Sequence, residues 1–141
     1  MNKTPLIYWK ADYNVGIQDI DNDHRQLVKM INRLFGSVLS SDPADVVNSV
    51  LKDLLAYVVF HFNRELALME KYGYPEREQH NNEHRLLLES ASQFKKRFDS
   101  GLAINIKEEI EVSLRDWLVN HVRNSDKRLG HFLLLRNNEL S

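Results

Sequence analysis

The sequence contains no cysteine, which excludes disulfides, thiolate zinc sites and thiol catalysis. It also lacks any apolar stretch long enough to span a bilayer. The first fifteen residues, MNKTPLIYWKADYNV, have none of the apolar core of a signal peptide. We therefore expect a cytoplasmic protein in a reducing setting, with no membrane contact.

An excess of charge of either sign is missing as well. Nineteen basic residues stand against twenty acidic ones, for a formal net charge of −1. This balance gives no electrostatic basis for binding nucleic acid or an anionic membrane surface. With 141 residues, of which 43% are hydrophobic and 28% charged, the chain has the composition of one globular domain covering residues 1–141.

Glycine and proline are scarce, and they fall between segments in which apolar residues recur at helical spacing. These segments predict helices at about 21–39, 43–71, 76–99 and 105–126. An irregular arm, 1–18, precedes them. The apolar tail at 129–141 follows Gly130 and is expected to add a helical turn or two. Long helices with short connections predict an all-α, antiparallel up-down-up-down four-helix bundle.

Each predicted helix carries potential metal ligands on its apolar side. The segments "HFNRE" and "HNNEH" each place two of them one turn apart on a helix. Seven potential ligands lie on the apolar sides of the predicted helices: His24, His61, Glu65, His80, His84, His121 and Asp126. They lie near the starts of the first and third helices and near the ends of the second and fourth. In an up-down-up-down bundle those four places coincide at one end, so all seven side chains can meet in a single layer.

Each of these residues has an ordinary explanation when taken alone. His24 could be a core histidine with satisfied nitrogens, His61 and Glu65 a pair on a helix surface, and Asp126 a solvated residue. Trp117 alone is better explained as core than as pocket wall. The convergence of all seven residues favours a metal site over these ordinary explanations, because burying five imidazoles and two carboxylates in one layer costs free energy unless a cation is present. His131, in the tail, falls outside the pattern and is expected to be an ordinary surface or packing residue.

The spacing of His121 and Asp126 does not fit a regular α-helix. Residues five apart differ by about 140° around the helix axis, so the two side chains would not share a face. We predict either a locally widened helix, as in a π-bulge, or a carboxylate that reaches in from a fraying end. An unbroken α-helix with both side chains inward would contradict this geometry.

Five imidazoles and two carboxylates are too many ligands for one ordinary ion, whereas two ions fit if the carboxylates bridge them. Imidazole and carboxylate ligands suit iron, among other first-row metals. Two octahedral ions offer about twelve positions, and the side chains with one bridging oxide or hydroxide would fill about eleven. The open position suits a small neutral diatomic molecule, and two ferrous ions can jointly supply two electrons to O₂.

At this point the chain resembles the bacterial hemerythrins along nearly its whole length. The resemblance rests on four blocks: Trp9, Tyr13, Val15-Gly16-Ile17, Ile20-Asp21 and His24; His61-Phe62, Glu65 and Met69; Tyr74-Pro75, His80 and His84; and Trp117-Leu118, His121 and Asp126. As a set these motifs are highly specific, and all seven ligand positions of the family are filled.

The resemblance implies a ligand set for each of two iron ions. His80, His84 and His121 would hold one iron. His24 and His61 would hold the other, which keeps the open position. Glu65 and Asp126 would bridge the two ions, together with an oxo or hydroxo group. The candidates for a dry O₂ pocket are Leu27, Phe62, Trp117, Leu118 and Val122.

The resemblance also implies a function, namely reversible O₂ binding at a non-heme di-iron centre for oxygen transport, storage or delivery. The protein would be a non-enzymatic carrier, with slow oxidase-type activity as a side reaction at most. O₂ is the implied partner, with oxygen-using enzymes as further candidates and a monomer or weak homo-oligomer as the assembly. The chain has Asp23 where the family often has Gln or Glu, and Leu66 where it often has a second Glu. These departures bear on the surroundings of the ligands and on surface charge.

The same ligand types leave other functions open. An O₂ or redox sensor would need a partner protein to carry the signal. An iron-handling protein or a di-iron oxidase is a further alternative, but a ferritin-like oxidase would use Glu-rich ligands with two Glu-x-x-His motifs, whereas here the pairing is His-x-x-x-Glu. An all-α metal-dependent phosphohydrolase would need an adjacent His-Asp dipeptide, which the sequence lacks.

Overall fold

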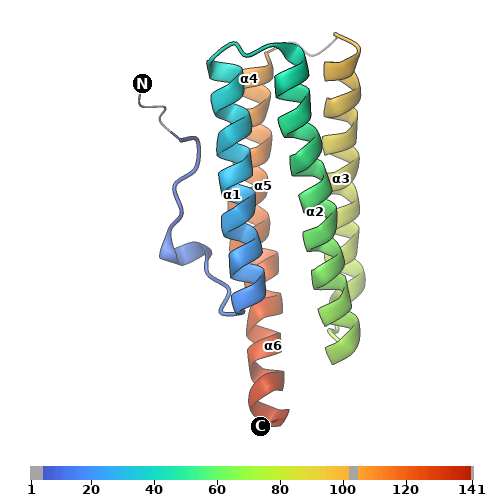
Figure 1. Cartoon of the computed structure of the whole chain (residues 1–141). Coiled ribbons are helices and arrows are strands. Elements are labelled where there is room, and N and C mark those ends of the chain that lie inside the picture. Colours follow the sequence, from blue (N-terminus) through green and yellow to red (C-terminus); the bar gives the residue numbers. More distant parts are fainter. Residues whose placement is uncertain (1–4, 102–104, 141) are drawn as a thin grey trace.

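Four long helical stretches run alternately up and down in the computed structural model, which confirms the predicted four-helix bundle (Figure 1). Residues 5–101 and 105–140 are described, with only the backbone described at 118, 119 and 137–140. The first three stretches are α1 (Gln18–Leu39), α2 (Ala44–Tyr72) and α3 (Arg77–Asp99). The fourth is built from α4 (Ile106–Glu109), η2 (Ile110–Leu114), α5 (Arg115–Trp117) and η3 (Leu118–Asp126), and α6 (Lys127–Leu140) follows it. Among the described residues, none of the helices combines the length and the apolar character needed to cross a membrane.

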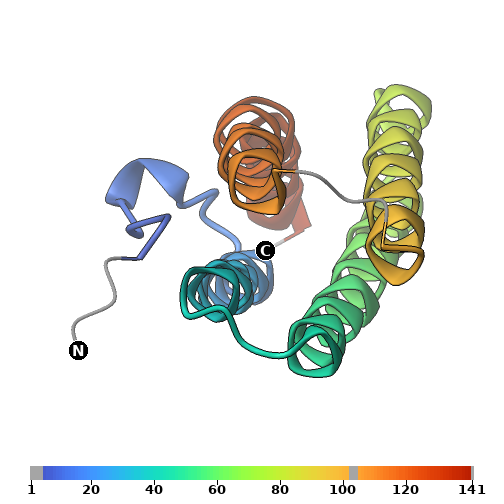
Figure 2. The same cartoon turned by 90° about the horizontal axis from the view of Figure 1, so that it is seen from above.

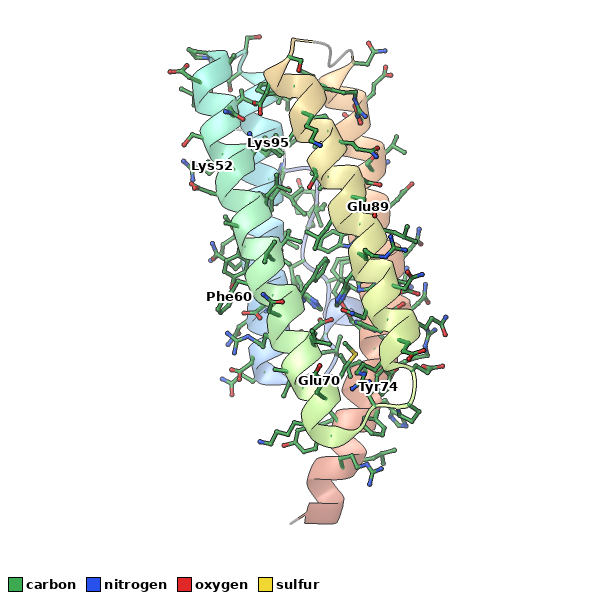
Figure 3. The ribbon with its side chains drawn as sticks, turned by 90° about the vertical axis from the view of Figure 1, so that its right-hand side faces the viewer. Lys52, Phe60, Glu70, Tyr74, Glu89 and Lys95 are labelled. Atoms are coloured by element: carbon green, nitrogen blue, oxygen red, sulfur yellow. The ribbon has the colours of Figure 1, made fainter. Side chains whose placement is uncertain are left out.

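The apolar stripes of the helices form the core, as their spacing in the sequence requires. Leu27, Ile31 and Leu34 of α1 are completely buried and belong to the same cluster as Leu51 and Leu54 of α2. Polar residues such as Lys52 of α2 and Glu89 of α3 lie on the outer faces of the bundle (Figure 3). The interior is therefore apolar over most of its length, and the predicted ligands interrupt it at one end.

The turn between α2 and α3 lies where the sequence predicts it. Gly73 ends α2 in the left-handed conformation, with φ of 66°, which glycine adopts without steric cost. The backbone N–H of Tyr74 donates a hydrogen bond to the carbonyl of Met69 at 2.9 Å and closes the helix end. This turn brings His80, near the start of α3, opposite the last turns of α2.

The helix α1 begins at Gln18, three residues earlier than predicted, so the arm ends at Ile17. The carboxylate of Asp21 accepts hydrogen bonds from the backbone N–H groups of Val15, at 2.7 Å, and Gly16, at 3.2 Å. Asp21 thereby fixes the end of the arm against the first turn of the helix that carries His24.

The tail differs from the prediction. A helical turn or two was expected after Gly130, but α6 has 14 residues, continues directly from η3 and extends beyond the rest of the bundle (Figure 1). Gly130 lies inside this helix and does not interrupt it. A Cβ atom at Gly130 would lie 2.4 Å from the carbonyl oxygen of Val15, so the glycine allows the arm to pass close to the helix.

The close approach of the Val15 carbonyl to Gly130 predicts that Gly130→Ala destabilises the fold. Alanine in an ordinary helix interior would stabilise the protein by about 1 kcal/mol relative to glycine. Here we expect a loss of about 1–3 kcal/mol in the free energy of unfolding, because backbone atoms of Val15 must move. Urea unfolding measures the change. The same substitution in a chain beginning at Gly16 serves as the control and should be neutral or stabilising; an equal loss there would contradict the contact.

Candidate metal centre

The structure brings together all seven predicted ligand residues at one end of the bundle. His24 comes from α1, His61 and Glu65 from α2, His80 and His84 from α3, and His121 and Asp126 from η3. The exposed fraction of each residue is between 0% and 7%. His131, in contrast, lies exposed on α6 and is not part of either ligand group, in line with its expected role.

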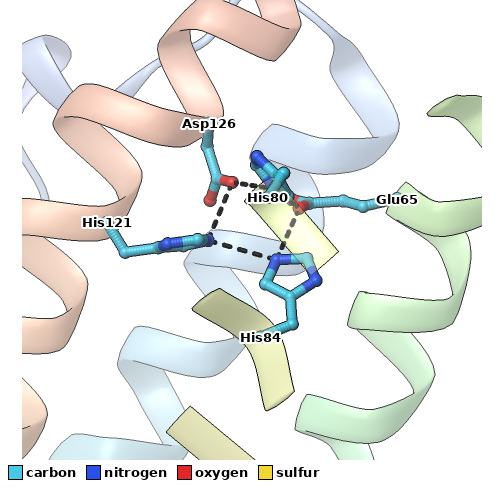
Figure 4. A group of neighbouring side chains, drawn as sticks. All are labelled: Glu65, His80, His84, His121 and Asp126. Carbon is cyan, nitrogen blue, oxygen red and sulfur yellow. Dashed lines mark hydrogen bonds and ion pairs between the residues drawn. The ribbon is translucent and has the colours of Figure 1, made fainter. Parts of the chain in front are cut away.

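The seven residues form two groups in which the potential ligand atoms all lie within 4.8 Å of one another. The first group consists of Glu65, His80, His84, His121 and Asp126 (Figure 4). The second group consists of His24, His61, Glu65 and Asp126. Glu65 and Asp126 belong to both groups, so the two carboxylates stand between three imidazoles on one side and two on the other.

All five imidazoles turn their Nε2 atoms toward these two carboxylates. Glu65 lies 2.8 Å from Nε2 of His61, 2.8 Å from that of His80 and 3.1 Å from that of His84. Asp126 lies 3.0 Å from Nε2 of His24 and 3.1 Å from that of His121. The same nitrogen from five rings therefore converges on one region of the core.

Several of these buried atoms have no hydrogen-bond partner in spite of the short distances. They are both nitrogens of His24, Nε2 of His61, Nδ1 of His84, Oε2 of Glu65 and both carboxylate oxygens of Asp126. In addition, Nε2 of His84 faces Nε2 of His121 at 3.1 Å. Buried polar atoms are nearly always paired, and lone pairs that converge without donors are what cations satisfy. The donor set fits two cations.

Without an ion between them, the carboxylates place protons on neighbouring imidazoles. Burial lowers the pKa of His24, but the carboxylates of Asp126 and Glu65 beside its Nε2 outweigh this effect and raise the pKa to about 10. The same balance raises the pKa of His80 to about 9. Burial raises the pKa of Glu65, but the positive charge of His61 and the neighbouring imidazoles of His24 and His80 hold it well below its ordinary value. Both bridging candidates, Glu65 and Asp126, are therefore anionic.

Two of the imidazoles have a further carboxylate at Nδ1, the ring nitrogen that does not face Glu65 and Asp126. Nδ1 of His61 lies 3.0 Å from Asp23, which also accepts hydrogen bonds from the hydroxyl of Tyr57 at 3.1 Å and from Nε of Arg64 at 2.7 Å. Nδ1 of His121 lies 3.1 Å from Glu83. A carboxylate at Nδ1 fixes the ring orientation and leaves Nε2 free to bind a metal.

Sequence analysis missed three of these supporting residues. Tyr57 and Arg64 lie on α2 and reach Asp23 across to α1, and no spacing in the sequence pairs them. Glu83 sits inside "HNNEH", but its partner His121 is on another helix; Ser125 also donates a hydrogen bond to it at 2.5 Å. Asp23 had been noted only as a departure from the family pattern.

The local conformation of η3 explains how His121 and Asp126 share a face. Residues 118–126 form a π-helix, in which hydrogen bonds join residues five apart, so positions i and i+5 lie above one another. This confirms the prediction of a widened helix. The π-helix continues into α6, so Asp126 does not reach in from a fraying end.

An apolar wall adjoins the ligands. Of the predicted pocket residues, Leu27 and Val122 are completely buried, Phe62 is 5% exposed and Trp117 is half-buried. The side chain of Leu118 lies outside the described part of the structure. Phe62 stacks on His84 with ring centroids 3.7 Å apart, and Trp117 lies parallel to His121 at 6.3 Å. These rings shield the imidazoles from the rest of the interior.

Comparisons with known proteins agree with this geometry. Residues 15–133 match the profile of the hemerythrin HHE cation binding domain. The bacteriohemerythrin of Pseudomonas aeruginosa is 36% identical over 85% of this chain and 76% of that protein. That of Methylococcus capsulatus is 30% identical over 89% of this chain and 95% of its own. A crystal structure of wild-type hemerythrin superposes with a TM-score of 0.83 at 30% identity, covering 91% of this chain and 98% of that one.

Proposed function

Because the chain belongs to the hemerythrin family, we propose that its buried cluster holds two iron ions and binds O₂ reversibly. One observation carries the proposal. Two groups of imidazole nitrogens lie on either side of Glu65 and Asp126, with buried lone pairs that lack hydrogen-bond donors. Imidazole and carboxylate together, with no thiolate in the chain, suit iron.

The two groups differ in the number of imidazoles that they offer. His80, His84 and His121 would hold one iron, whereas His24 and His61 would hold the other and leave room beside it for O₂. Glu65 and Asp126, which belong to both groups, would be shared by the two ions. Ferrous iron held at this site would supply the electrons for reversible O₂ binding.

The surrounding residues keep this exchange reversible by excluding water and fixing the ligands. Leu27, Phe62 and Val122 are buried and provide no hydrogen-bond donor that would draw water to the site. Asp23 holds His61 through Nδ1 and is itself held by Arg64, so the imidazole keeps its orientation when O₂ arrives or leaves. Glu83 does the same for His121.

The role that fits this site is carriage, storage or delivery of oxygen. An apolar wall next to a single free position favours a small neutral ligand and disfavours a polar organic substrate. The site therefore binds O₂ and releases it unchanged, without catalysing its transfer to a second molecule. Oxygen-using enzymes are the natural recipients.

Stoichiometry tests the proposal. After anaerobic reconstitution with ferrous iron and desalting, metal analysis should find two irons per chain, and gas-uptake measurement should find one O₂ per chain that is recovered under vacuum. One iron per chain, or continuous O₂ consumption when a reductant is supplied, would show that the site is mononuclear or that it turns over as an oxidase.

The shifted histidines predict how the metal-free protein responds to pH. The folded-state pKa values of His24 and His80, about 10 and about 9, lie above the ordinary value of 6.5. Their protonation therefore stabilises the fold fully below pH 6.5, and this contribution is lost as the pH rises through 9 to 10. We expect the free energy of unfolding, measured in urea, to fall between pH 7 and pH 10.

The iron-loaded protein is the control for this experiment. An imidazole bound to iron through Nε2 carries no proton there, so His24 and His80 no longer titrate in that range. The unfolding free energy should change less between pH 7 and pH 10 when iron is bound. A metal-free protein that becomes more stable over the same range would contradict the assignment of protons to these two imidazoles.

A further inference from the structure

A cavity of about 240 Å³ lies in the part of the bundle next to the metal centre, toward the opposite end from the turn between α2 and α3. All four helical stretches contribute to its lining. Seen along the bundle axis, α3 stands apart from α4 and α5 (Figure 2). Residues of all three helices line the cavity. This space is separate from the seven ligand residues, none of which lines it.

Most of the lining is apolar; its polar residues are Ser90, Gln93, Arg97, Glu109 and Ser113, and Trp117 adds an indole N–H that has no hydrogen-bond partner. Arg97 donates a hydrogen bond to Glu109, which joins α3 to α4 and neutralises both charges. Arg97 lies 13 residues after His84, and Glu109 lies 12 residues before His121. No unpaired charge of the described lining therefore calls for an ionic ligand, and a charged molecule would have to enter without a counterion.

The floor of the cavity is made of the same two rings that support the metal centre. Phe62 and Trp117 line the cavity on one side and lie parallel to His84 and His121 on the other. An occupant would therefore contact Phe62 and Trp117, and these two rings would separate it from the imidazoles of His84 and His121. It could reside there without displacing any ligand residue.

Size and chemistry together define the occupant. An enclosed apolar cavity of about 150 Å³ is enough to bind benzene or xenon. The cavity of this protein is larger and partly open, so a ring can enter it and gain the dispersion contacts that unfilled space forfeits. We propose that the cavity of this protein binds a neutral, single-ring hydrocarbon or a close analogue with a short alkyl substituent. The volume is far larger than a diatomic molecule requires, so this is a second ligand site and does not depend on O₂ binding at the cluster.

Calorimetric titration of the iron-loaded protein with toluene tests the proposal. Ala91 lines the cavity, so Ala91→Phe places a ring inside it. Ala56 lies on the exposed side of α2, so Ala56→Phe makes the same chemical change outside. We expect saturable binding of one toluene per chain in the unchanged protein and in Ala56→Phe, and at least tenfold weaker binding in Ala91→Phe. No saturable binding, or equal binding by both variants, would overturn the proposal.

Crystals of the unchanged protein under xenon pressure give a second measurement that stands even if Ala91→Phe does not fold. The expected result is a xenon atom in contact with Leu54, Phe94 and Trp117. Crystals in which xenon occupies other places only would overturn the assignment of the cavity as a ligand site.

Discussion

Replacing Glu65 with alanine is expected to remove the paired iron centre and O₂ binding together. Glu65 belongs to both ligand groups and lies within about 3 Å of Nε2 atoms from both, including His61 at 2.8 Å and His80 at 2.8 Å. Without it the two groups share only Asp126. We expect the iron content after desalting to fall from two per chain to one or fewer, and O₂ uptake to become undetectable.

A matched control is available on the same helix. Glu70 lies five residues further along α2, with its side chain exposed (Figure 3). Glu70→Ala makes the same chemical change outside the cluster and should keep two irons and one O₂ per chain. Circular dichroism of both variants reports whether the helices are intact. If a folded Glu65→Ala protein retained two irons and full O₂ uptake, Glu65 would not be a bridging ligand.

Iron binding is also expected to raise the stability of the fold. The metal-free protein must bury two carboxylates and five imidazoles, several of them with unpaired lone pairs. A ligand at about 1,000 times its dissociation constant, and bound by the folded state alone, adds about 4 kcal/mol. For a chain of this size that corresponds to about 10 °C or more in the thermal midpoint. Anaerobic scanning calorimetry with and without ferrous iron measures the shift.

The two carboxylate variants separate stabilisation at the cluster from weak binding elsewhere. Glu70→Ala should show the full rise on adding iron, and Glu65→Ala should show little of it, because its cluster no longer holds the pair. Addition of a strong chelator should return the unchanged protein to the lower midpoint. Equal midpoints with and without iron would mean that the cluster is satisfied by its own hydrogen bonds and protons.

The fold and the positions of the candidate ligands were predictable because one-dimensional spacing determines them. Helical periodicity located the first three stretches and the start of the fourth to within about three residues, although the fourth continues past Asp126 into α6. The alternating direction of an up-down bundle places His24, near the start of one helix, at the level of His61, near the end of the next. The five-residue spacing of His121 and Asp126 indicated a widened helix, which is observed as η3.

The remaining features depend on contacts between distant segments. The sequence predicts only a helical turn or two after Gly130, whereas α6 continues through this glycine, which the close approach of Val15 explains. Arg64 and Tyr57 hold Asp23 across two helices, and neither residue carries a local signal of that role. The cavity likewise depends on how far apart α3 and α4 stand, which no pattern within one helix can specify.

The most direct test of the central claim is the visible spectrum of the reduced, iron-loaded protein through repeated cycles of O₂ admission and removal. We expect an absorption band that appears with O₂, disappears when O₂ is removed and returns with the same amplitude, at two irons per chain. A band that never forms, or iron that is oxidised in the first cycle and does not recover, would contradict reversible O₂ binding at the cluster.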